Sequence, residues 1–297
     1  MRHARVGTSN HRWRRPARAV VAAVRGHVSI ADALREAVGG PNVRVRSLER
    51  DARGPLVLLS PHLDDAVFSC WSVAARGGDV TVVNVFAAIP PIGLLTTWDR
   101  LTGATDSAIR MKERIAEDRA ALSRAERSPV NLHFLAGDYR RRPPNIRTLL
   151  TALVECAPKA SCVYAPAGIG GNGDHLLVTR LGYAIAASGV PVRLYADIPY
   201  AVTYGWPHWV TGGEIKPFVR PEVHWEPYLH GSRWASARLV PEVVVLSDDD
   251  RRAKAAAMQE YRSQLPAITG GSLDRLNAPA IGSFEVFWDV ELDAGGE

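Results

Sequence analysis

Histidine and aspartate side chains are concentrated in two short segments of the sequence, SPHLDD at 60–65 and GIGGNGDH at 168–175. In the first segment His62 and Asp65 are three residues apart, so both can face one metal ion, while Asp64 between them could hold a water molecule. His175 in the second segment could supply a third ligand. Two histidines and one aspartate leave one position on a zinc ion open for water and substrate. The alternative is that the adjacent carboxylates only cap a helix.

Both segments follow predicted strands, because the chain alternates between β-branched runs and helical patterns. The continuous apolar run at 55–60 is typical of a buried parallel strand. The same alternation predicts further strands at 79–86, 130–135, 161–165 and 192–196, and helices at 64–76, 106–123, 145–155 and 174–187. This order predicts a Rossmann-like α/β fold, a doubly wound and mostly parallel sheet with helices on both faces. Such sheets bind ligands at the carboxyl ends of their strands, where both segments would lie.

The sequence divides into a basic N-terminal arm or helical extension at residues 1–50 and a single α/β domain at residues 51–297. The Pro-, Gly- and Thr-rich stretch 87–105 is too irregular for a helix or strand and predicts an active-site loop. From about residue 198 the alternation weakens, and this C-terminal part is expected to cap one end of the sheet. The elements predicted there are a strand at 241–246 and a helix at 248–264.

The positive charge of the chain is concentrated at its N-terminus. The formal net charge is +5, yet the first 30 residues contain seven arginines and no acidic residue, so the remaining residues carry a net charge of −2. A basic arm could attract phosphate or anionic lipid, although it is also typical of a solvated tail. Because the body of the chain is slightly acidic, we expect no nucleic-acid partner.

Apolar segments and cysteine spacing indicate where the protein acts. The apolar run at 19–24 is ended by Arg25 after six residues, whereas an export signal needs roughly 7 to 15 and a membrane span roughly 20. We therefore expect neither export nor a membrane span. The three cysteines have spacings that fit neither a disulfide framework nor metal-binding pairs. A cytoplasmic location, where thiols stay reduced, is the prediction.

The two polar segments together resemble the motifs of the PIG-L/LmbE-like zinc-dependent de-N-acetylase family. That family carries a His-Pro/Leu-Asp-Asp motif, here HLDD at 62–65, and a His-x-Asp-His motif, here NGDH at 172–175. The resemblance covers roughly residues 55–265. It includes an Arg-x-x-Glu pattern at 110–113, the segment YADIPY at 195–200 and Ser-Gln at 263–264.

The resemblance implies one Zn²⁺ per chain, bound by His62, Asp65 and His175, with Asp64 as the general base. The implied reaction is hydrolysis of an N-acetyl group on an aminosugar-containing small molecule, such as an N-acetylglucosaminyl compound. The products are acetate and a free amine.

Asn172 stands where the family motif begins with a histidine. In the family that histidine faces the reacting carbonyl, and the neighbouring aspartate, here Asp174, holds it. Asparagine can donate a hydrogen bond to an oxyanion but cannot supply a proton to the leaving amine. The resemblance therefore implies that Asp64 returns the proton it took from water, or that hydrolysis is slow or lost.

Three other functions remain open. A thiol-conjugate amidase would use the same site, and a metal-binding protein could hold the ion without hydrolysis. Gly168, Gly170 and Gly173 also match the G-x-G-x-x-G pattern of a dinucleotide-binding loop, with Asp197 following Gly173 by 24 residues. Against a dinucleotide, two residues separate the predicted strand from the first glycine.

Other polar side chains near the ends of predicted elements are candidates for substrate binding. Arg110 begins the helix after the irregular loop, Asp138 follows the third predicted strand, and Asp197 and Tyr200 follow the last. Surface ion pairs and turns are the alternative roles. A wall that stacks on carbohydrate is predicted from Trp206, Trp209, Trp225 and Trp234. Nothing in the sequence indicates the oligomeric state.

Overall fold

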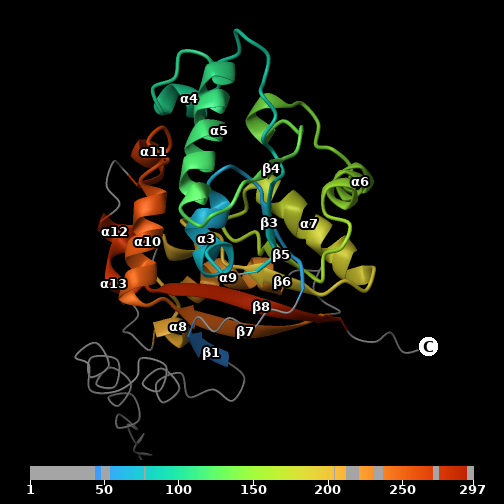
Figure 1. Cartoon of the computed structure of the whole chain (residues 1–297), viewed down its shortest axis with the longest axis vertical. Helices are drawn as coiled ribbons and strands as arrows, with labels where there is room; N and C mark the ends of the chain where they lie inside the picture. Colours follow the sequence, from blue (N-terminus) through green and yellow to red (C-terminus); the bar gives the residue numbers. More distant parts are fainter. Residues whose placement is uncertain are drawn as a thin grey trace, which may run out of the picture.

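The computed structural model describes residues 44–47, 54–76, 78–203, 205–211, 221–230, 237–269 and 274–292. Within these ranges the strands form one eight-stranded sheet in the order β1-β7-β8-β6-β5-β2-β3-β4 (Figure 1). The strands are β1 Arg44–Ser47, β2 Leu56–Ser60, β3 Val80–Asn84, β4 Val130–Asn131, β5 Cys162–Pro166, β6 Val192–Tyr195, β7 Ala237–Val245 and β8 Phe284–Leu292. Neighbouring strands are parallel, except that β8 runs antiparallel to both β6 and β7.

Helices cover both faces of the sheet, which confirms the predicted fold class (Figure 1). One face carries α3, α5 and α10, and the other carries α6 and α7. The helices are α3 Asp65–Ala74, α4 Thr97–Leu101, α5 Ser107–Ser123, α6 Ile146–Cys156, α7 Gly173–Ala187, α8 His208–Thr211, α9 Pro221–Leu229, α10 Asp248–Met258, α11 Leu265–Thr269, α12 Asp274–Asn277 and α13 Pro279–Gly282, with short 3₁₀ helices η1 Gly137–Tyr139 and η2 Tyr200–Val202. Of the helices described, none has the length and apolarity that crossing a bilayer requires.

The order in which the chain adds strands to the sheet reverses between β2 and β5. From β2 it proceeds to β3 and then β4 on one side, and from β5 it proceeds to β6 on the other. All five residues of β2 are buried, as the apolar run predicted. The connections that leave the carboxyl ends of β2 and β5 therefore diverge and leave a crevice between them, which is where open α/β sheets bind ligands.

The C-terminal part belongs to the sheet, which corrects the expectation of a cap from about residue 198. β7 pairs with β8 along all nine residues of each strand, and β8 also pairs with β6. β8 was not predicted, because Glu285 lies fully buried within it and interrupts the apolar run that marks a buried strand. β1, which pairs with β7, lies inside residues 1–50, so the predicted arm also contributes a strand. The rest of that arm lies outside the described residues.

One predicted strand and one predicted helix are shorter than expected, and a stretch predicted to be irregular contains a short helix. The strand predicted at 130–135 is reduced to the two residues of β4. The irregular stretch 87–105 contains the short helix α4, whose first turn is capped by Thr96. The helix predicted at 248–264 ends at Met258, after which the chain turns and buries Tyr261.

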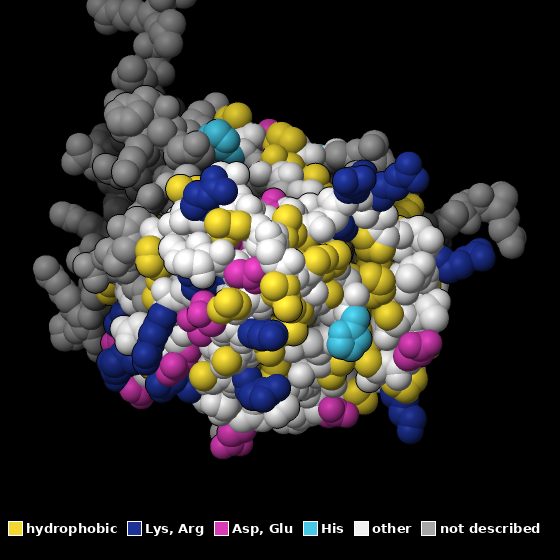
Figure 2. Space-filling view, turned by 90° about the horizontal axis from the view of Figure 1, so that it is seen from above, with side chains coloured by type: hydrophobic (Ala, Val, Ile, Leu, Met, Phe, Trp, Pro, Cys, Tyr) yellow, Lys and Arg dark blue, Asp and Glu magenta, His cyan; other side chains and the backbone are white. Residues whose placement is uncertain are grey.

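The tryptophans expected to form a carbohydrate wall instead form part of the core. Trp206 and Trp225 are buried and meet edge to face at 5.9 Å between ring centroids. Trp209 and Trp288 pack edge to face against Trp225. Trp234 lies outside the described residues. The face seen in Figure 2 mixes hydrophobic, basic and acidic side chains without a large patch of one kind.

A buried carboxylate connects β8 to the centre of α3. The backbone of Cys70 (φ −138°, ψ 34°) interrupts α3. Glu285 accepts hydrogen bonds from the backbone N–H groups of Trp71 (2.8 Å) and Ser72 (2.9 Å), and its Oε1 lies 2.6 Å from Nζ of Lys254 in α10. Because Lys254 and Glu285 are both buried, each charge depends on the other for compensation.

Lys254→Met is expected to lower the free energy of unfolding by roughly 3–5 kcal/mol, because it leaves the Glu285 carboxylate buried without its counter-ion. Arg238→Met is the matched control. Arg238 pairs with Glu291 between β7 and β8 at an exposed position, and its loss should change the free energy by less than about 1 kcal/mol. Urea unfolding measures both variants. Equal losses would contradict the special role of the buried pair.

Candidate active site

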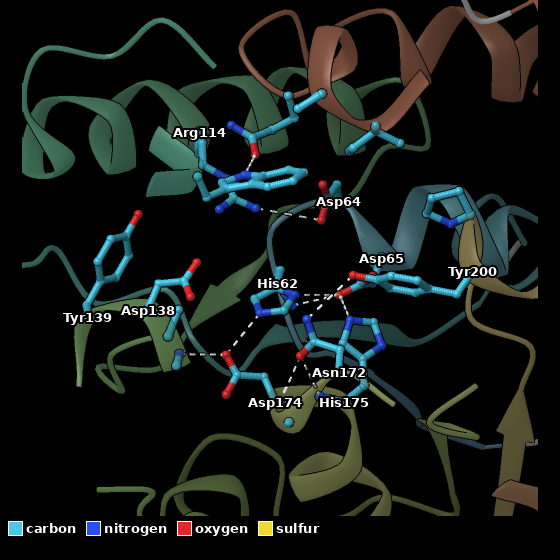
Figure 3. Close-up of a pocket in the computed structure, with 18 of the residues that line it drawn as sticks. His62, Asp64, Asp65, Arg114, Asp138, Tyr139, Asn172, Asp174, His175 and Tyr200 are labelled. Carbon is cyan, nitrogen blue, oxygen red and sulfur yellow. Dashed lines mark hydrogen bonds and ion pairs between the residues drawn. The ribbon is translucent and has the colours of Figure 1, made fainter. Parts of the chain in front are cut away.

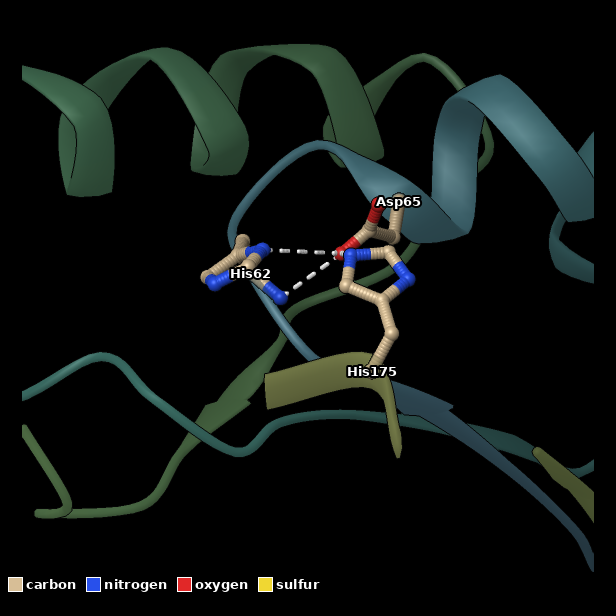
Figure 4. Close-up of side chains that lie close together, drawn as sticks. All are labelled: His62, Asp65 and His175. Atoms are coloured by element: carbon tan, nitrogen blue, oxygen red, sulfur yellow. Dashed lines mark hydrogen bonds and ion pairs between the residues drawn. The ribbon is translucent and has the colours of Figure 1, made fainter. Parts of the chain in front are cut away.

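The loop after β2 and the first turn of α7 bring His62, Asp65 and His175 together (Figures 3 and 4). One nitrogen or oxygen atom from each side chain lies within 4.8 Å of the corresponding atoms of the other two. Oδ2 of Asp65 is 3.5 Å from Nδ1 of His62 and 3.3 Å from Nε2 of His175. Two elements that are more than 100 residues apart in the sequence thus present three metal-ligating groups to one point.

The conformation of the first loop is set by Ser60, the last residue of β2. Its hydroxyl donates to the backbone oxygen of His62 (2.5 Å) and accepts a hydrogen bond from the backbone N–H of Ala66 (3.0 Å). The backbone N–H of His62 donates to Oδ2 of Asp65 (2.8 Å). These bonds fold the loop tightly, so that residues 62 and 65 face the same side, as their spacing predicted.

Each histidine contacts a second carboxylate through its other ring nitrogen. Nδ1 of His175 is 2.6 Å from Oδ1 of Asp197, and Nε2 of His62 is 3.1 Å from Oδ2 of Asp174. Carboxylates in such positions orient metal-ligating histidines and raise their basicity. One nitrogen of each ring and the Asp65 carboxylate are left facing one another, so these residues fit a zinc ion in donor type and arrangement.

The charges of this cluster compensate one another. Burial by itself opposes ionisation of His62, but hydrogen bonds to Asp174 and Asp65 raise its pKa to about 10. Burial also opposes ionisation of Asp65, yet the neighbouring His175 and His62 lower its pKa. For His175, Asp65 and Asp197 outweigh burial and raise the pKa. Asp65 and the two histidines therefore favour one another's charged forms.

Asp64 faces the same cavity but stays apart from the three ligands. It occupies the N-cap position of α3 without making a side-chain capping bond, so the helix-cap interpretation does not apply to it. Its Oδ1 lies 3.8 Å from Nη2 of Arg114. Burial raises the pKa of Asp64, and the Arg114 guanidinium partly opposes that rise. A carboxylate with a raised pKa is better suited to accept a proton near neutral pH.

Asn172 caps the helix that carries the second motif. Its Oδ1 accepts hydrogen bonds from the backbone N–H groups of Asp174 (2.9 Å) and His175 (3.5 Å). Its Nδ2 lies 3.5 Å from the hydroxyl oxygen of Tyr200. The sequence led us to expect Asp174 to hold residue 172, but its carboxylate contacts His62, the backbone N–H of Gly137 and Arg140 instead.

A cavity of about 740 Å³ opens in front of these residues. Figure 3 shows Asp138 and Tyr139 on one side of His62 and Tyr200 on the other. The cavity is also lined by Gln264, which belongs to the segment quoted in the family resemblance, and by side chains that the sequence did not indicate, chiefly Arg114, Arg141, Arg142 and Ile268. Trp98 comes from the predicted active-site loop and donates from its indole nitrogen to Oε1 of Gln264 (3.0 Å).

Two of the four predicted substrate-binding residues line the cavity and two do not. Asp138 and Tyr200 belong to its lining, whereas Asp197 is fully buried behind His175. Arg110 bonds Glu113 and the backbone oxygen of Thr102, outside the lining.

The Arg-x-x-Glu pattern that the sequence analysis quoted, at 110–113, lies one helical turn before the copy that reaches the site. The sequence repeats the pattern at Arg114 and Glu117, and this second copy is the one that reaches the site. Arg114 pairs with Asp64, and Glu117 accepts hydrogen bonds from the backbone N–H (2.8 Å) and hydroxyl (2.6 Å) of Ser263. The second copy was therefore the signal that could have identified Arg114.

The glycine-rich loop has a structural reason that does not involve a dinucleotide. Gly170 has φ +92°, and a Cβ there would lie 2.6 Å from atoms of the Tyr200 side chain. Both carboxylate oxygens of Asp197 are engaged, one by His175 and the other by the backbone N–H of Ile169 (2.9 Å). The loop is therefore shaped to approach Tyr200, and Asp197 has no free oxygen for a ribose.

Asp197→Asn is expected to lower the affinity for Zn²⁺ by roughly 10- to 100-fold, because His175 loses the carboxylate that orients it. Competition with a chromophoric chelator measures the affinity. Asp138→Asn, a cavity residue for which no histidine contact is found among the described residues, is the matched control and should bind Zn²⁺ normally. Unchanged affinity in a folded Asp197→Asn variant would contradict this positioning role.

Comparison with known proteins relates the chain to deacetylases. No family model matches it. It is 30% identical over 187 residues to the 2'-N-acetylparomamine deacetylase of Streptomyces fradiae, a match that spans 56% of this chain and 64% of that protein. The A40926 pseudoaglycone deacetylase has 25% identity and a TM-score of 0.61, and a triple mutant of a deacetylase of teicoplanin biosynthesis has 27% and 0.61. Each of these two structural matches covers 82% of this chain and 100% of the other.

Proposed function

We propose that this chain is a zinc-dependent N-deacetylase of the PIG-L/LmbE-like type. Its substrate would be an aminosugar-containing small molecule from which it removes an N-acetyl group, releasing acetate and a free amine. The observation that carries the proposal is the convergence of His62, Asp65 and His175 in front of a cavity that also contains Asp64. The named deacetylases to which the chain is similar support the same reaction.

His62, Asp65 and His175 would hold one Zn²⁺. When bound, such an ion polarises an acyl carbonyl and makes a water molecule more acidic. The protein's part is to supply neutral histidine nitrogens in fixed orientations, which Asp174 and Asp197 do through their hydrogen bonds.

Asp64 is the proposed general base. Its carboxylate is buried and makes no capping bond, so it is free to accept a proton from the attacking water. Arg114 at 3.8 Å stabilises its ionised form. After the carbonyl carbon has been attacked, the same carboxyl group can return the proton to the departing amine.

Asn172 and Tyr200 are the proposed hydrogen-bond donors to the acyl oxygen. The capping bonds use the Oδ1 atom of Asn172 and leave its Nδ2 directed toward Tyr200. Burial raises the pKa of Tyr200 to about 12, so its hydroxyl keeps its proton at neutral pH. Neither group supplies a proton to the amine, which is why Asp64 is assigned both proton transfers.

The proposal extends to domain organisation, location and partner. We propose that the residues from about 51 onward act as one domain, that the enzyme works in the cytoplasm, and that its partner is the small-molecule substrate.

Asp64→Asn should retain bound zinc and lose roughly 10²- to 10⁴-fold in turnover, because the amide cannot accept the proton of the attacking water. His175→Ala is the comparison variant and should lose the metal. Metal content and release of free amine from an N-acetylglucosaminide are measured for both. Loss of zinc from Asp64→Asn to the extent seen in His175→Ala would overturn the division between base and ligand.

Asn172→Ala and Asn172→Ser separate capping from catalysis. Alanine removes the cap of α7 and should lower the free energy of unfolding by about 1 kcal/mol, whereas serine keeps a capping oxygen. Both lack the amide donor, so both should lose turnover, by up to roughly 10²-fold as for other oxyanion donors. Thermal unfolding and initial rates measure the two effects. A serine variant with full activity would restrict Asn172 to capping.

A further inference from the structure

The segment that follows η1 forms one wall of the cavity and is unusually basic. Arg140, Arg141 and Arg142 are consecutive and all line the cavity, as do Asp138 and Tyr139 before them. Figure 3 shows Asp138 and Tyr139 on the side of His62 that is opposite Tyr200. Asp138 and Tyr139 therefore lie across His62 from Tyr200, one of the two proposed acyl-oxygen donors, so a group that they contact belongs to another part of the substrate than the acyl group.

The arginines of the cavity divide into two paired and two unpaired side chains. Arg114 pairs with Asp64, and Arg140 pairs with Asp174 and also lies 4.5 Å from the ring centroid of Phe86. Arg141 and Arg142 are exposed, and within the part of the chain that the structure describes neither makes a hydrogen bond or an ion pair. Two guanidinium groups at the cavity wall are thus available to a ligand.

Other parts of the cavity lining are apolar. They include Trp98, Ile198, Ala267 and Ile268. A cavity of about 740 Å³ lies within the range of about 300–1,000 Å³ that holds drug-sized ligands, so it can accept more than one sugar ring. A ligand that fills it would place one portion against apolar side chains and another against the two arginines.

We propose that Arg141 and Arg142 bind an acidic group of the substrate, a carboxylate or a phosphate carried on the portion beyond the N-acetylated sugar. The proposal rests on the deacetylase function and specifies its substrate class. Guanidinium groups form paired, charge-assisted hydrogen bonds with both kinds of anion. The same wall carries one further carboxylate, that of Asp138, so these three side chains together have a net positive charge.

The test compares substrates that share the reacting group and differ in charge. Phenyl N-acetyl-β-glucosaminide is neutral, its 4-carboxyphenyl analogue carries a carboxylate, and N-acetylglucosamine 1-phosphate carries a phosphate. The zinc-loaded protein should show a kcat/KM for at least one acidic substrate that is about tenfold or more above that for the neutral one. The acid that gains more identifies the anion, and the preference should weaken as ionic strength rises.

Arg141→Gln/Arg142→Gln should reduce the ratio of acidic to neutral kcat/KM to about one. The ratio is taken within each variant, so a general effect on catalysis cancels. Arg147→Gln is the matched control, because Arg147 is exposed on the neighbouring helix α6 and lies outside the cavity lining. This variant should keep the ratio of the unmodified protein.

Calorimetric binding to the Asp64→Asn protein separates this proposal from the proposed function. Tighter binding of the acidic ligands, lost in the added double arginine substitution, supports the acidic subsite without any turnover. Hydrolysis of all substrates at equal kcat/KM, with equal affinities, would overturn the subsite and leave the deacetylase function standing. Selective binding of the acidic ligands without hydrolysis by the zinc-loaded unmodified protein would overturn the deacetylase function alone.

Discussion

β2 and β5 lie side by side, and the chain leaves their carboxyl ends in opposite directions. The proposed metal ligands and the proposed general base depend on this arrangement. The loop after β2 carries His62, Asp64 and Asp65, and the connection after β5 carries Asn172 and His175. Because the two connections diverge to opposite faces of the sheet, the space between them stays open to substrate. The neighbouring strand β6 ends at the same edge and supplies Asp197 behind His175.

The site is built from buried charges that must balance. Asp65, Asp174 and Asp197 surround two histidines, and together they favour positive charge at the centre. Hydrogen bonds to Asp174 and Asp65 outweigh burial and raise the pKa of His62. A divalent ion would bind at the same point, where a histidine nitrogen can ligate it only in the deprotonated form. Two of these carboxylates, Asp174 and Asp197, are placed to orient the histidine ligands.

The C-terminal strand links the stability of the sheet to the position of the site. Glu285 of β8 bonds the backbone of α3 just after its interruption at Cys70 and pairs with Lys254 of α10. α3 begins at Asp65, so this network holds the helix that presents a proposed ligand. A second long-range contact, from Glu117 of α5 to Ser263, fixes the segment that brings Gln264 and α11 to the cavity.

Features that depend on local spacing could be predicted from the sequence. The apolar run of β2, the tight HLDD loop and the alternation of strands and helices predicted the fold class and brought His62, Asp65 and His175 to one edge of the sheet. Other features were decided only by contacts between distant segments. Arg114 rather than Arg110 reaches Asp64, because the packing of α5 directs only the second of two identical Arg-x-x-Glu patterns toward the site. Asp197 contacts His175 rather than substrate, because it is fully buried at the end of β6. β8 could not be predicted, because the charge of its buried Glu285 is compensated by Lys254 only in the folded protein.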